Sequence, residues 1–330
     1  MFFLPYNPED RFLRTFPMPD PHTQTMQCME VWGGNQPADS GVIMPGLDAW
    51  VYSRPHGDAT GGGDVHYVSS CATGRITRLL VADVSGHGAA VSETAGKLRS
   101  LMRRYVNYID QTRFVRALND EFIALAQEQR FATAVAATFF GPTHSLALCN
   151  AGHPPPLFYE ARTGTWQVLE QARSPSSGDP SNMPLGILDM TQYEQFALRL
   201  REGDMVLCYT DALIEAKDKK GEWLGTPGLL EIVRGIDVSE PGEFIKRLLA
   251  AIAAIRPGNL EDDDVTALLF RHNGLVPRIS FFKKAMAPLR VLAAAFGSLR
   301  PGAGPAPWPE MSLANLAGAK AKPVSGKVGK

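Results

Sequence analysis

Acidic residues at four places in the sequence have the type and the surroundings for metal-dependent chemistry. Each stands next to an apolar segment or a glycine-rich turn; they are Asp64, Asp83, Asp211 and the acidic run 261–264. Carboxylates held at one edge of a sheet repel one another unless a cation lies between them. Oxygen ligands favour hard ions such as Mg²⁺ or Mn²⁺, and two such ions about 4 Å apart can activate water against a phosphoryl group.

Each of these acids has a simpler explanation when it is taken alone, because Asp is common in turns and at helix N-caps. That explanation weakens for four acids in the same setting, and a site for divalent cations accounts for all of them. Asp83 is the central candidate. The apolar run 79–82 would hold its carboxylate at the end of a buried strand, and Gly86 and Gly88 suit a tight turn.

The apolar pattern predicts strands that follow strands and helices that come in pairs. The expected strands are 28–33, 47–54, 65–72, 77–84, 131–140, 145–150, 156–159, 165–169, 193–200, 205–209 and 265–271. The expected helices are 89–108, 111–127, 228–234 and 241–255, and residues 34–46 are expected to form a loop. This order favours an α+β protein, with antiparallel sheets and helices on their outer faces, over a βαβ winding.

The composition is that of a globular protein with a large core, since 45% of the 330 residues are hydrophobic and 20% are charged. The net charge is −1, and nothing in its distribution predicts a nucleic-acid-binding domain. The cysteines at 28, 71, 149 and 208 form no CxxC pair, so we expect reduced thiols. With no leader pattern and no apolar run of about 18 residues, we expect a cytoplasmic protein.

Three parts are expected along the chain. Residues 1–45 would form an extended N-terminal lead-in, residues 46–274 the folded domain, and residues 275–330 a basic, partly disordered tail. The tail carries nine Lys or Arg and one acid. Its apolar and basic segment 279–299 is expected to pack on its own domain, with contact to a membrane surface as the alternative.

Eight short motifs occur in one order between about residues 47 and 272. They are Gly62-Gly63-Asp64, 82–88 (ADVSGHG), Phe131-Ala132-Thr133, 150–155 (NAGHPP), Pro184-Leu185-Gly186, 209–216 (YTDALIEA), 221–225 (GEWLG) and 263–266 (DDVT). In these motifs the chain resembles the metal-dependent protein Ser/Thr phosphatases (PPM family), in the bacterial branch of SpoIIE-like sporulation and sigma-regulator phosphatases. The resemblance implies a four-layer α/β/β/α sandwich of two antiparallel sheets flanked by helix pairs.

The resemblance also implies a set of metal ligands for two Mn²⁺ or Mg²⁺ ions. Asp83 would bridge the ions, and the backbone carbonyl of Val84 would contact one of them. Asp211 and Asp263 would hold one ion and Asp64 would approach the other. Counting back from Thr266 favours Asp263 over Asp264, which remains the alternative.

Two positions depart from the pattern of that branch. Tyr67 stands where a second acid is usual after the Gly-Gly-Asp aspartate, and Ala212 replaces a glycine. The general-acid histidine of the wider family would fall at Ser85, so we expect a turn or capping role for His87. His153 is expected to be structural, and His66 is left open between a structural and a functional role.

The implied function is hydrolysis of phosphoserine or phosphothreonine on a regulatory protein, such as an anti-sigma-factor antagonist. Water activated by two metal ions would attack phosphorus directly, so no catalytic Ser or Cys is expected. The partners would be a phosphorylated protein substrate and a regulatory partner or second copy of the chain, with no nucleic acid. The alternative is a phosphatase-like protein that binds a partner without turnover.

Overall fold

The apolar run before Asp83 forms strand β6 (Ile76–Val84), which is covered on both faces. Leu80 and Ala82 pack into a core on one side of the strand, and Leu79 and Val81 pack into a second core on the other. Successive side chains of a strand point to opposite faces of its sheet, so a strand covered on both faces carries a continuous apolar run.

The computed structural model describes residues 23–26, 31–57, 59–71, 75–86, 89–104, 110–125, 130–170, 181–189 and 191–275. In spatial order the seven-stranded sheet contains β1 (Thr23–Thr25), β3 (Ala38–Met44), β4 (Leu47–Arg54), β13 (Val265–His272), β12 (Met205–Tyr209), β9 (Leu157–Glu160) and β10 (Thr165–Val168). The six-stranded sheet contains β11 (Gln195–Arg199), β8 (Ser145–Ala151), β7 (Ala132–Phe140), β6, β5 (Asp64–Cys71) and β2 (Val31–Gly34).

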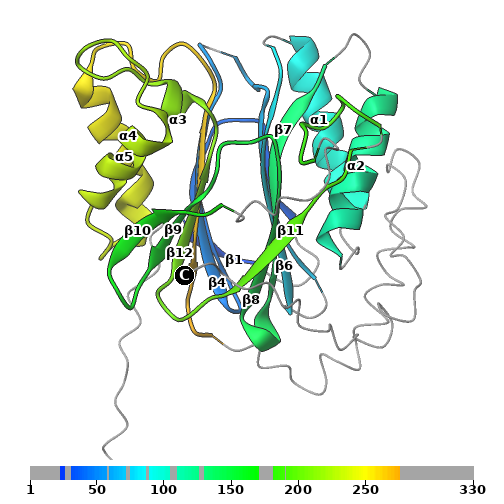
Figure 1. Ribbon diagram of the computed structural model, residues 1–330, viewed down its shortest axis with the longest axis horizontal. Coiled ribbons are helices and arrows are strands. Elements are labelled where there is room, and N and C mark those ends of the chain that lie inside the picture. Colours follow the sequence, from blue (N-terminus) through cyan, green and yellow to red (C-terminus); the bar gives the residue numbers. More distant parts are fainter. Residues whose placement is uncertain are drawn as a thin grey trace, which may run out of the picture.

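The two sheets lie face to face, and a group of helices covers each outer face (Figure 1). The helices are α1 (Ala89–Arg104), α2 (Gln111–Leu125), α3 (Ala212–Glu215), α4 (Gly225–Arg234) and α5 (Pro241–Ile255). α1 and α2 cover the six-stranded sheet, and α3 to α5 cover the other. This arrangement confirms the predicted four-layer sandwich. Every strand pair is antiparallel except β1 with β3, which is parallel.

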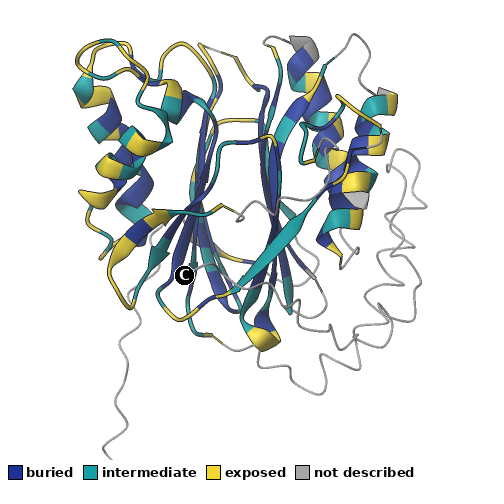
Figure 2. Ribbon diagram, in the orientation of Figure 1, coloured by how far each residue is buried: buried dark blue, intermediate teal, exposed yellow. Residues whose placement is uncertain are grey.

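Three layers of buried side chains hold the four structural layers together (Figure 2). The central one lies between the sheets, and β13 contributes Leu268 and Phe270 to it. The same strand sends Leu269 to the core beneath α4 and α5. Because the central strands are anchored on both faces, their ends are fixed in position, and the predicted site residues follow or begin those strands.

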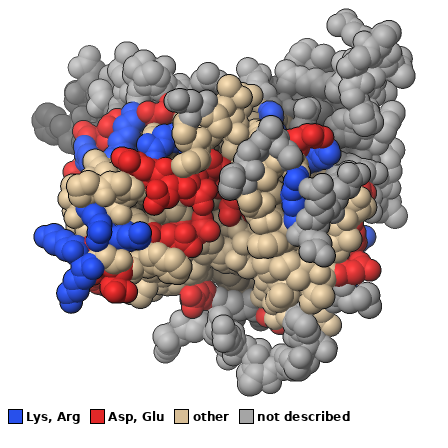
Figure 3. All heavy atoms as spheres, turned by 90° about the horizontal axis from the view of Figure 1, so that it is seen from above, with Lys and Arg blue, Asp and Glu red and all other residues tan. Residues whose placement is uncertain are grey.

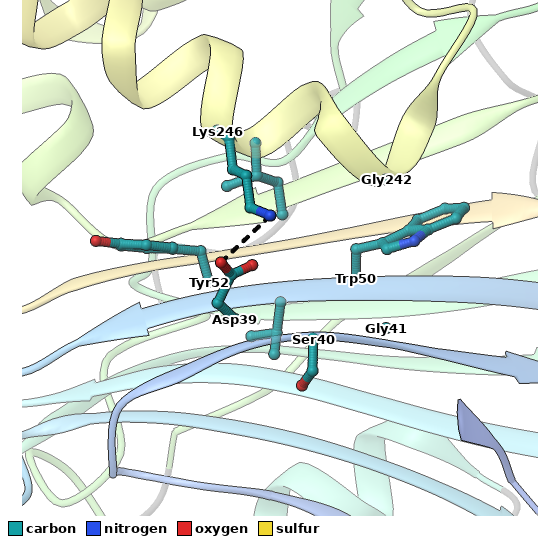
Figure 4. Close-up of a pocket in the computed structure, with 9 residues that line it drawn as sticks. Asp39, Ser40, Gly41, Trp50, Tyr52, Gly242 and Lys246 are labelled. Carbon is teal, nitrogen blue, oxygen red and sulfur yellow. Dashed lines mark ion pairs between the residues drawn. The ribbon is translucent and has the colours of Figure 1, made fainter. Parts of the chain in front are cut away.

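Helix α5 lies close over β3 and β4 (Figure 4). A Cβ atom on Gly242 would come within 3.2 Å of the Trp50 indole nitrogen, so a residue without a side chain suits the close approach. Nearby, Lys246 forms an ion pair with Asp39 at 3.4 Å. The space left between helix and strands is a cavity of only about 10 Å³, the size of one water molecule.

The lead-in predicted for residues 1–45 and the loop predicted for residues 34–46 are wrong in part. Strands β2 and β3 lie within these residues, and β3 pairs with β4 along its whole length. Gly41 and the polar start of β3 obscured a strand whose second half, from Gly41 to Met44, is largely buried. The tail 276–330, the first 22 residues and His87 lie outside the described residues.

None of the helices in the described ranges has both the length and the apolar character needed to cross a bilayer. Of the four cysteines, Cys149 and Cys208 are buried free thiols, as expected. Burial raises the pKa of each to about 12, so neither is a thiolate at neutral pH.

Candidate metal centre

The predicted acids stand at one end of the two sheets. Asp64 and Asp83 are direct partners on β5 and β6 in the six-stranded sheet. In the other sheet, Asp211 follows the end of β12 and Asp263 precedes the start of β13, its antiparallel neighbour. Figure 3 shows this end of the molecule from above, with Asp and Glu side chains gathered in the middle of the face.

Asp83 lies in an environment that disfavours its charged form. Burial raises the pKa of Asp83 to about 7, and the carboxylates of Asp211, Asp263, Asp264 and Glu215 add to the rise. None of these five acids forms an ion pair with a Lys or Arg in the described part of the chain. The cluster therefore lacks the positive charge that would stabilise it.

Asp211 and Glu215 show the same effect. Burial raises the pKa of Asp211, and the negative charge of Asp263 raises it further. Burial also raises the pKa of Glu215, with smaller contributions from the charges of Asp211 and Asp263. Glu215 was not among the predicted site residues. Its position four residues after Asp211 was the available indication, because the helical turn α3 places residues at this spacing on one face.

Asp64 is held differently from the rest of the cluster. Its carboxylate is buried, and Oδ2 accepts a hydrogen bond of 2.8 Å from the Thr210 hydroxyl. The Thr210 oxygen in turn accepts from the Thr266 amide at 3.0 Å, and the Thr266 and Ser53 hydroxyls lie 2.9 Å apart. Burial and the charges of Asp83 and Asp264 raise the pKa of Asp64, whereas the Thr210 and Thr266 hydroxyls lower it. The network joins the two sheets directly beneath the acidic cluster.

Asp264 binds the backbone of the glycine-rich loop. Its Oδ1 accepts from the His56 amide at 2.6 Å, and its Oδ2 accepts from the amides of Gly63 and Asp64 at 2.5 and 3.3 Å. The carboxylate thus positions the loop that carries Asp64. Asp263 is exposed, and its negative charge raises the pKa values of Asp83 and Asp211. The structure therefore gives the two neighbouring aspartates different surroundings.

Positions 62 and 63 require glycine, because other atoms lie where the side chain of any other residue would begin. A Cβ atom on Gly62 would lie 2.2 Å from Asp264 Oδ2, and one on Gly63 would lie 2.7 Å from the Val84 carbonyl oxygen. The same carbonyl is the predicted backbone ligand. The glycines therefore let the loop approach both groups closely.

Gly62→Ala is expected to destabilise the protein by about 1–3 kcal/mol, because the added methyl group displaces the Asp264 carboxylate from its amide donors. Urea unfolding measures the change. Gly96→Ala is the matched control, since its Cβ would meet nothing within 4 Å and alanine suits a helix. A Gly62→Ala protein as stable as the wild type would contradict the proposed role of this close contact.

His153 lies buried beside strands β7 and β8 of the six-stranded sheet. Its Nδ1 lies 2.8 Å from the Thr133 hydroxyl, and its amide donates to the Asn150 side chain at 2.8 Å. Burial lowers the pKa of His153 to about 3, although the Tyr209 backbone favours the protonated form. A histidine that stays neutral at neutral pH is not a proton donor there.

His153 is expected to make the protein sensitive to acid. Its pKa is about 3 in the folded chain and 6.5 in the unfolded chain, so the unfolded chain binds more protons between these values. Stability is therefore lost as the pH falls from 6.5 towards 3, by an amount on the order of a few kcal/mol. Urea unfolding of His153→Gln should show a weaker pH dependence over this window.

The remaining predicted positions lie away from the acidic cluster. Tyr67 is buried in the core under α1 and α2, so the position that usually carries an acid faces the core in this chain. His66 is buried as well and contacts the Trp32 ring edge-on. Burial and then Arg99 lower the pKa of His66 to about 4. These surroundings favour a structural role for His66.

Within the described part of the chain, no three His, Cys, Asp or Glu side chains lie close enough together to hold a metal ion as they stand. The backbone brings Asp83, Asp211 and Asp263 to the same end of the sheets, and their charges act on one another. Ligation by these three carboxylates would require the side chains to move closer together.

Comparison with known proteins places the fold and the motifs in one family. The profile of Stage II sporulation protein E (SpoIIE) matches residues 73–273. Phosphoserine phosphatase RsbU from Bacillus subtilis is 23% identical over 194 residues, which is 58% of this chain and 55% of RsbU. The chain thus spans about half the length of this curated relative.

Two solved structures have the same fold. The RsbU and RsbW domains of Rv1364c from Mycobacterium tuberculosis match with a TM-score of 0.58 and 25% identity, covering 77% of this chain and 70% of that one. The PP2C phosphatase domain of SpoIIE from Bacillus subtilis, solved with a fragment of its regulatory domain, matches with a TM-score of 0.56 and 17% identity, covering 74% and 64%. The profile match extends over more than half of the chain, and the chain therefore belongs to the Stage II sporulation protein E family.

Proposed function

We propose that the chain is a metal-dependent phosphatase that hydrolyses phosphoserine or phosphothreonine on a protein. One observation carries the proposal: Asp83 lies half-buried among Asp211, Asp263, Asp264 and Glu215 without a basic partner in the described ranges. Several carboxylates in this setting fit divalent cations, which neutralise their charge. Among the residues that the structure describes, no histidine or cysteine that would favour zinc is part of the cluster.

We propose that the residues predicted from the sequence hold two ions of Mn²⁺ or Mg²⁺ once their side chains move closer together. Asp83 would contact both ions, Asp211 and Asp263 would hold one, Asp64 would approach the other, and the Val84 carbonyl would contact one of them. When bound, two such ions polarise a phosphoryl group and lower the pKa of a water molecule. Thr210, through its hydrogen bond, keeps the Asp64 carboxylate turned towards the space between the sheets.

We propose that the described protein groups contribute position and charge, and that none of them acts as a nucleophile. Cys149 and Cys208 are buried and protonated, and His153 is buried and neutral. The Asp264 carboxylate holds the loop that carries Asp64, so this loop is already in position when a substrate binds. These features support direct hydrolysis without a covalent enzyme intermediate.

The relatives support a phosphorylated regulatory protein as the substrate. RsbU is named a phosphoserine phosphatase, and the mycobacterial structure joins an RsbU domain to an RsbW domain. We therefore propose phosphoserine on a regulator of the anti-sigma-factor antagonist type as the substrate, with a cytoplasmic site of action.

Phosphate release from a phosphoserine peptide tests the proposal. Wild-type protein with Mn²⁺ should release phosphate, and the same protein with EDTA should not. Asp211→Asn should be nearly inactive with Mn²⁺, whereas Asp189→Asn, an exposed aspartate away from the cluster, should retain activity. Wild-type protein that is inactive with both Mn²⁺ and Mg²⁺ would favour the alternative, a phosphatase-like protein that binds its partner without turnover.

A further inference from the structure

A hollow of about 370 Å³ adjoins the acidic cluster on the side of α3 and α5. We propose that this hollow binds the segment next to the phosphoserine of a protein substrate and selects a segment that carries Asp or Glu. The inference rests on the proposed phosphatase function and adds a preference for the sequence around the phosphorylated residue. The hollow is much larger than the cavity beneath α5, and its volume lies within the range of small-ligand sites.

Two loops form the hollow, and the buried Asn259 fixes them to each other. Its Oδ1 accepts from the Lys217 amide at 2.9 Å, and its Nδ2 donates to the Lys217 carbonyl at 2.9 Å. Nδ2 also lies 3.1 Å from the Ile252 carbonyl of α5. The hairpin that begins at Lys217 is thereby tied to the loop between α5 and β13, so the hollow is formed before a ligand arrives.

The lining of the hollow carries charges of both signs. Asp263 and Glu215 line it where it meets the acidic cluster. Asp262 lines it as well, and the two cations of the lining, Lys217 and Arg256, are both exposed. The Arg256 guanidinium lies next to the hairpin, because a Cβ atom on Gly221 would lie 2.9 Å from it. Neither cation forms an ion pair with a described carboxylate, so both are available to a ligand.

Trp223 provides an apolar surface in the same hollow. It pairs with Lys217 across the hairpin, yet its side chain is 68% exposed, the most exposed of the large hydrophobic residues in the described ranges. Trp and Arg are the residues that most often dominate the binding energy of protein interfaces. A Trp and an unpaired Arg that line one hollow therefore fit a peptide and not a small ion.

The arrangement of charges selects the peptide. A phosphoserine at the acidic cluster would place its neighbours along the hollow, since an extended chain advances about 3.3 Å per residue. Asp or Glu within four residues would reach Lys217 or Arg256, whereas Lys or Arg would be repelled by them. Once metal ions neutralise the acidic cluster, Lys217 and Arg256 offer complementary charge to an acidic flank.

Fluorescence anisotropy with labelled peptides tests the inference. Three peptides carry a non-hydrolysable phosphonate in place of phosphoserine, with Glu, Ala or Lys at the flanking positions, and each is titrated with wild-type protein and Mn²⁺. We expect the Glu peptide to bind about 5- to 10-fold more tightly than the Lys peptide. Arg256→Glu should abolish or invert this preference, and Trp223→Ala should weaken binding of all three peptides about 10-fold.

Arg162→Glu is the matched control, because it makes the same charge change in the turn between β9 and β10. It should keep the wild-type preference. Equal affinity of wild-type protein for all three peptides would overturn the inference. So would an Arg256→Glu protein that binds all three peptides equally more weakly, since Arg256 would then bind the phosphate itself.

Hydrolysis of the matching phosphoserine peptides separates this inference from the proposed function. A charge preference in binding without any phosphate release would contradict the phosphatase function and support the peptide site. Phosphate release that proceeds equally from all three peptides would support the phosphatase function and overturn the peptide site.

Discussion

Asp83→Asn is expected to lower Mn²⁺-dependent hydrolysis of a phosphoserine peptide by about 10³-fold or more. Asp83 is the acid on which the charges of Asp211 and Asp263 converge, and it is the proposed bridge between two ions. Loss of a group that holds both ions removes several kcal/mol of transition-state stabilisation, and about 4 kcal/mol corresponds to 10³-fold. Initial rates of phosphate release with saturating Mn²⁺ measure the effect.

The same substitution is expected to stabilise the metal-free protein at high pH. The pKa of Asp83 is about 7 in the folded chain against an ordinary value of 3.8, so the folded chain holds the proton more tightly. The wild type therefore loses stability as the pH rises from about 4 to 7, whereas Asn does not titrate. In urea unfolding with EDTA, the advantage of Asp83→Asn should be larger at pH 8 than at pH 5.

These two readouts distinguish a metal ligand from a structural residue. A residue needed mainly for folding would lower activity and stability together. An Asp83→Asn protein that is less stable than the wild type at pH 8 with EDTA would contradict the account of Asp83 as an uncompensated charge, whatever its activity.

Although Asp263 and Asp264 are neighbours, Asp263→Asn is expected to abolish activity and Asp264→Asn is expected to lower stability. Asp263 is exposed and faces other carboxylates, so its replacement should abolish activity with Mn²⁺ and leave the metal-free stability unchanged or higher. Asp264 accepts from three backbone amides, so its replacement should cost about 2–4 kcal/mol of stability. Urea unfolding with EDTA measures both changes.

The Mn²⁺-induced rise in melting temperature gives a second comparison of this pair. Asp263→Asn should lose the rise, because a ligand stabilises a protein only to the extent that it binds the folded state. Asp264→Asn should start from a lower melting temperature and still respond to Mn²⁺. The reverse pattern would make Asp264 the ligand and Asp263 the anchor of the loop.

Much of the fold was predictable because its central strands are buried on both faces. Strand β6 and strand β13 appear in the sequence as continuous apolar runs, and each is followed or preceded by the acids of the site. The order of strands and paired helices then indicated the four layers. Strand β3 was missed because its first half is polar and partly exposed, so its pairing with β4 depends on tertiary contacts.

The position of Asp83, Asp211 and the acidic run 261–264 at one end of the sheets was predictable from strand ends. The choice of Asp263 within that run came from the resemblance to the PPM family, and the roles of the neighbouring residues were not predictable. The motif DDVT contains two aspartates, and only the positions of the His56 and Gly63 amides show that the second one accepts hydrogen bonds from the loop. The contact of Thr210 with Asp64 joins residues 146 positions apart. A single sequence carries no direct indication of such a pair.

The peptide hollow was not predictable either, because its parts are unremarkable in the sequence. Lys217, Trp223 and Arg256 belong to separate loops and carry no spacing typical of a site. Asn259 brings the loops together through backbone contacts that the sequence pattern does not reveal.

Calorimetric titration of the metal-free protein with Mn²⁺ tests the central claim most directly. If Asp83, Asp211 and Asp263 form a metal centre with Asp64 and Val84, wild-type protein should bind two Mn²⁺ ions per chain, and Asp83→Asn should bind neither tightly. Wild-type protein without saturable binding, or an Asp83→Asn protein with the wild-type stoichiometry and affinity, would contradict the account.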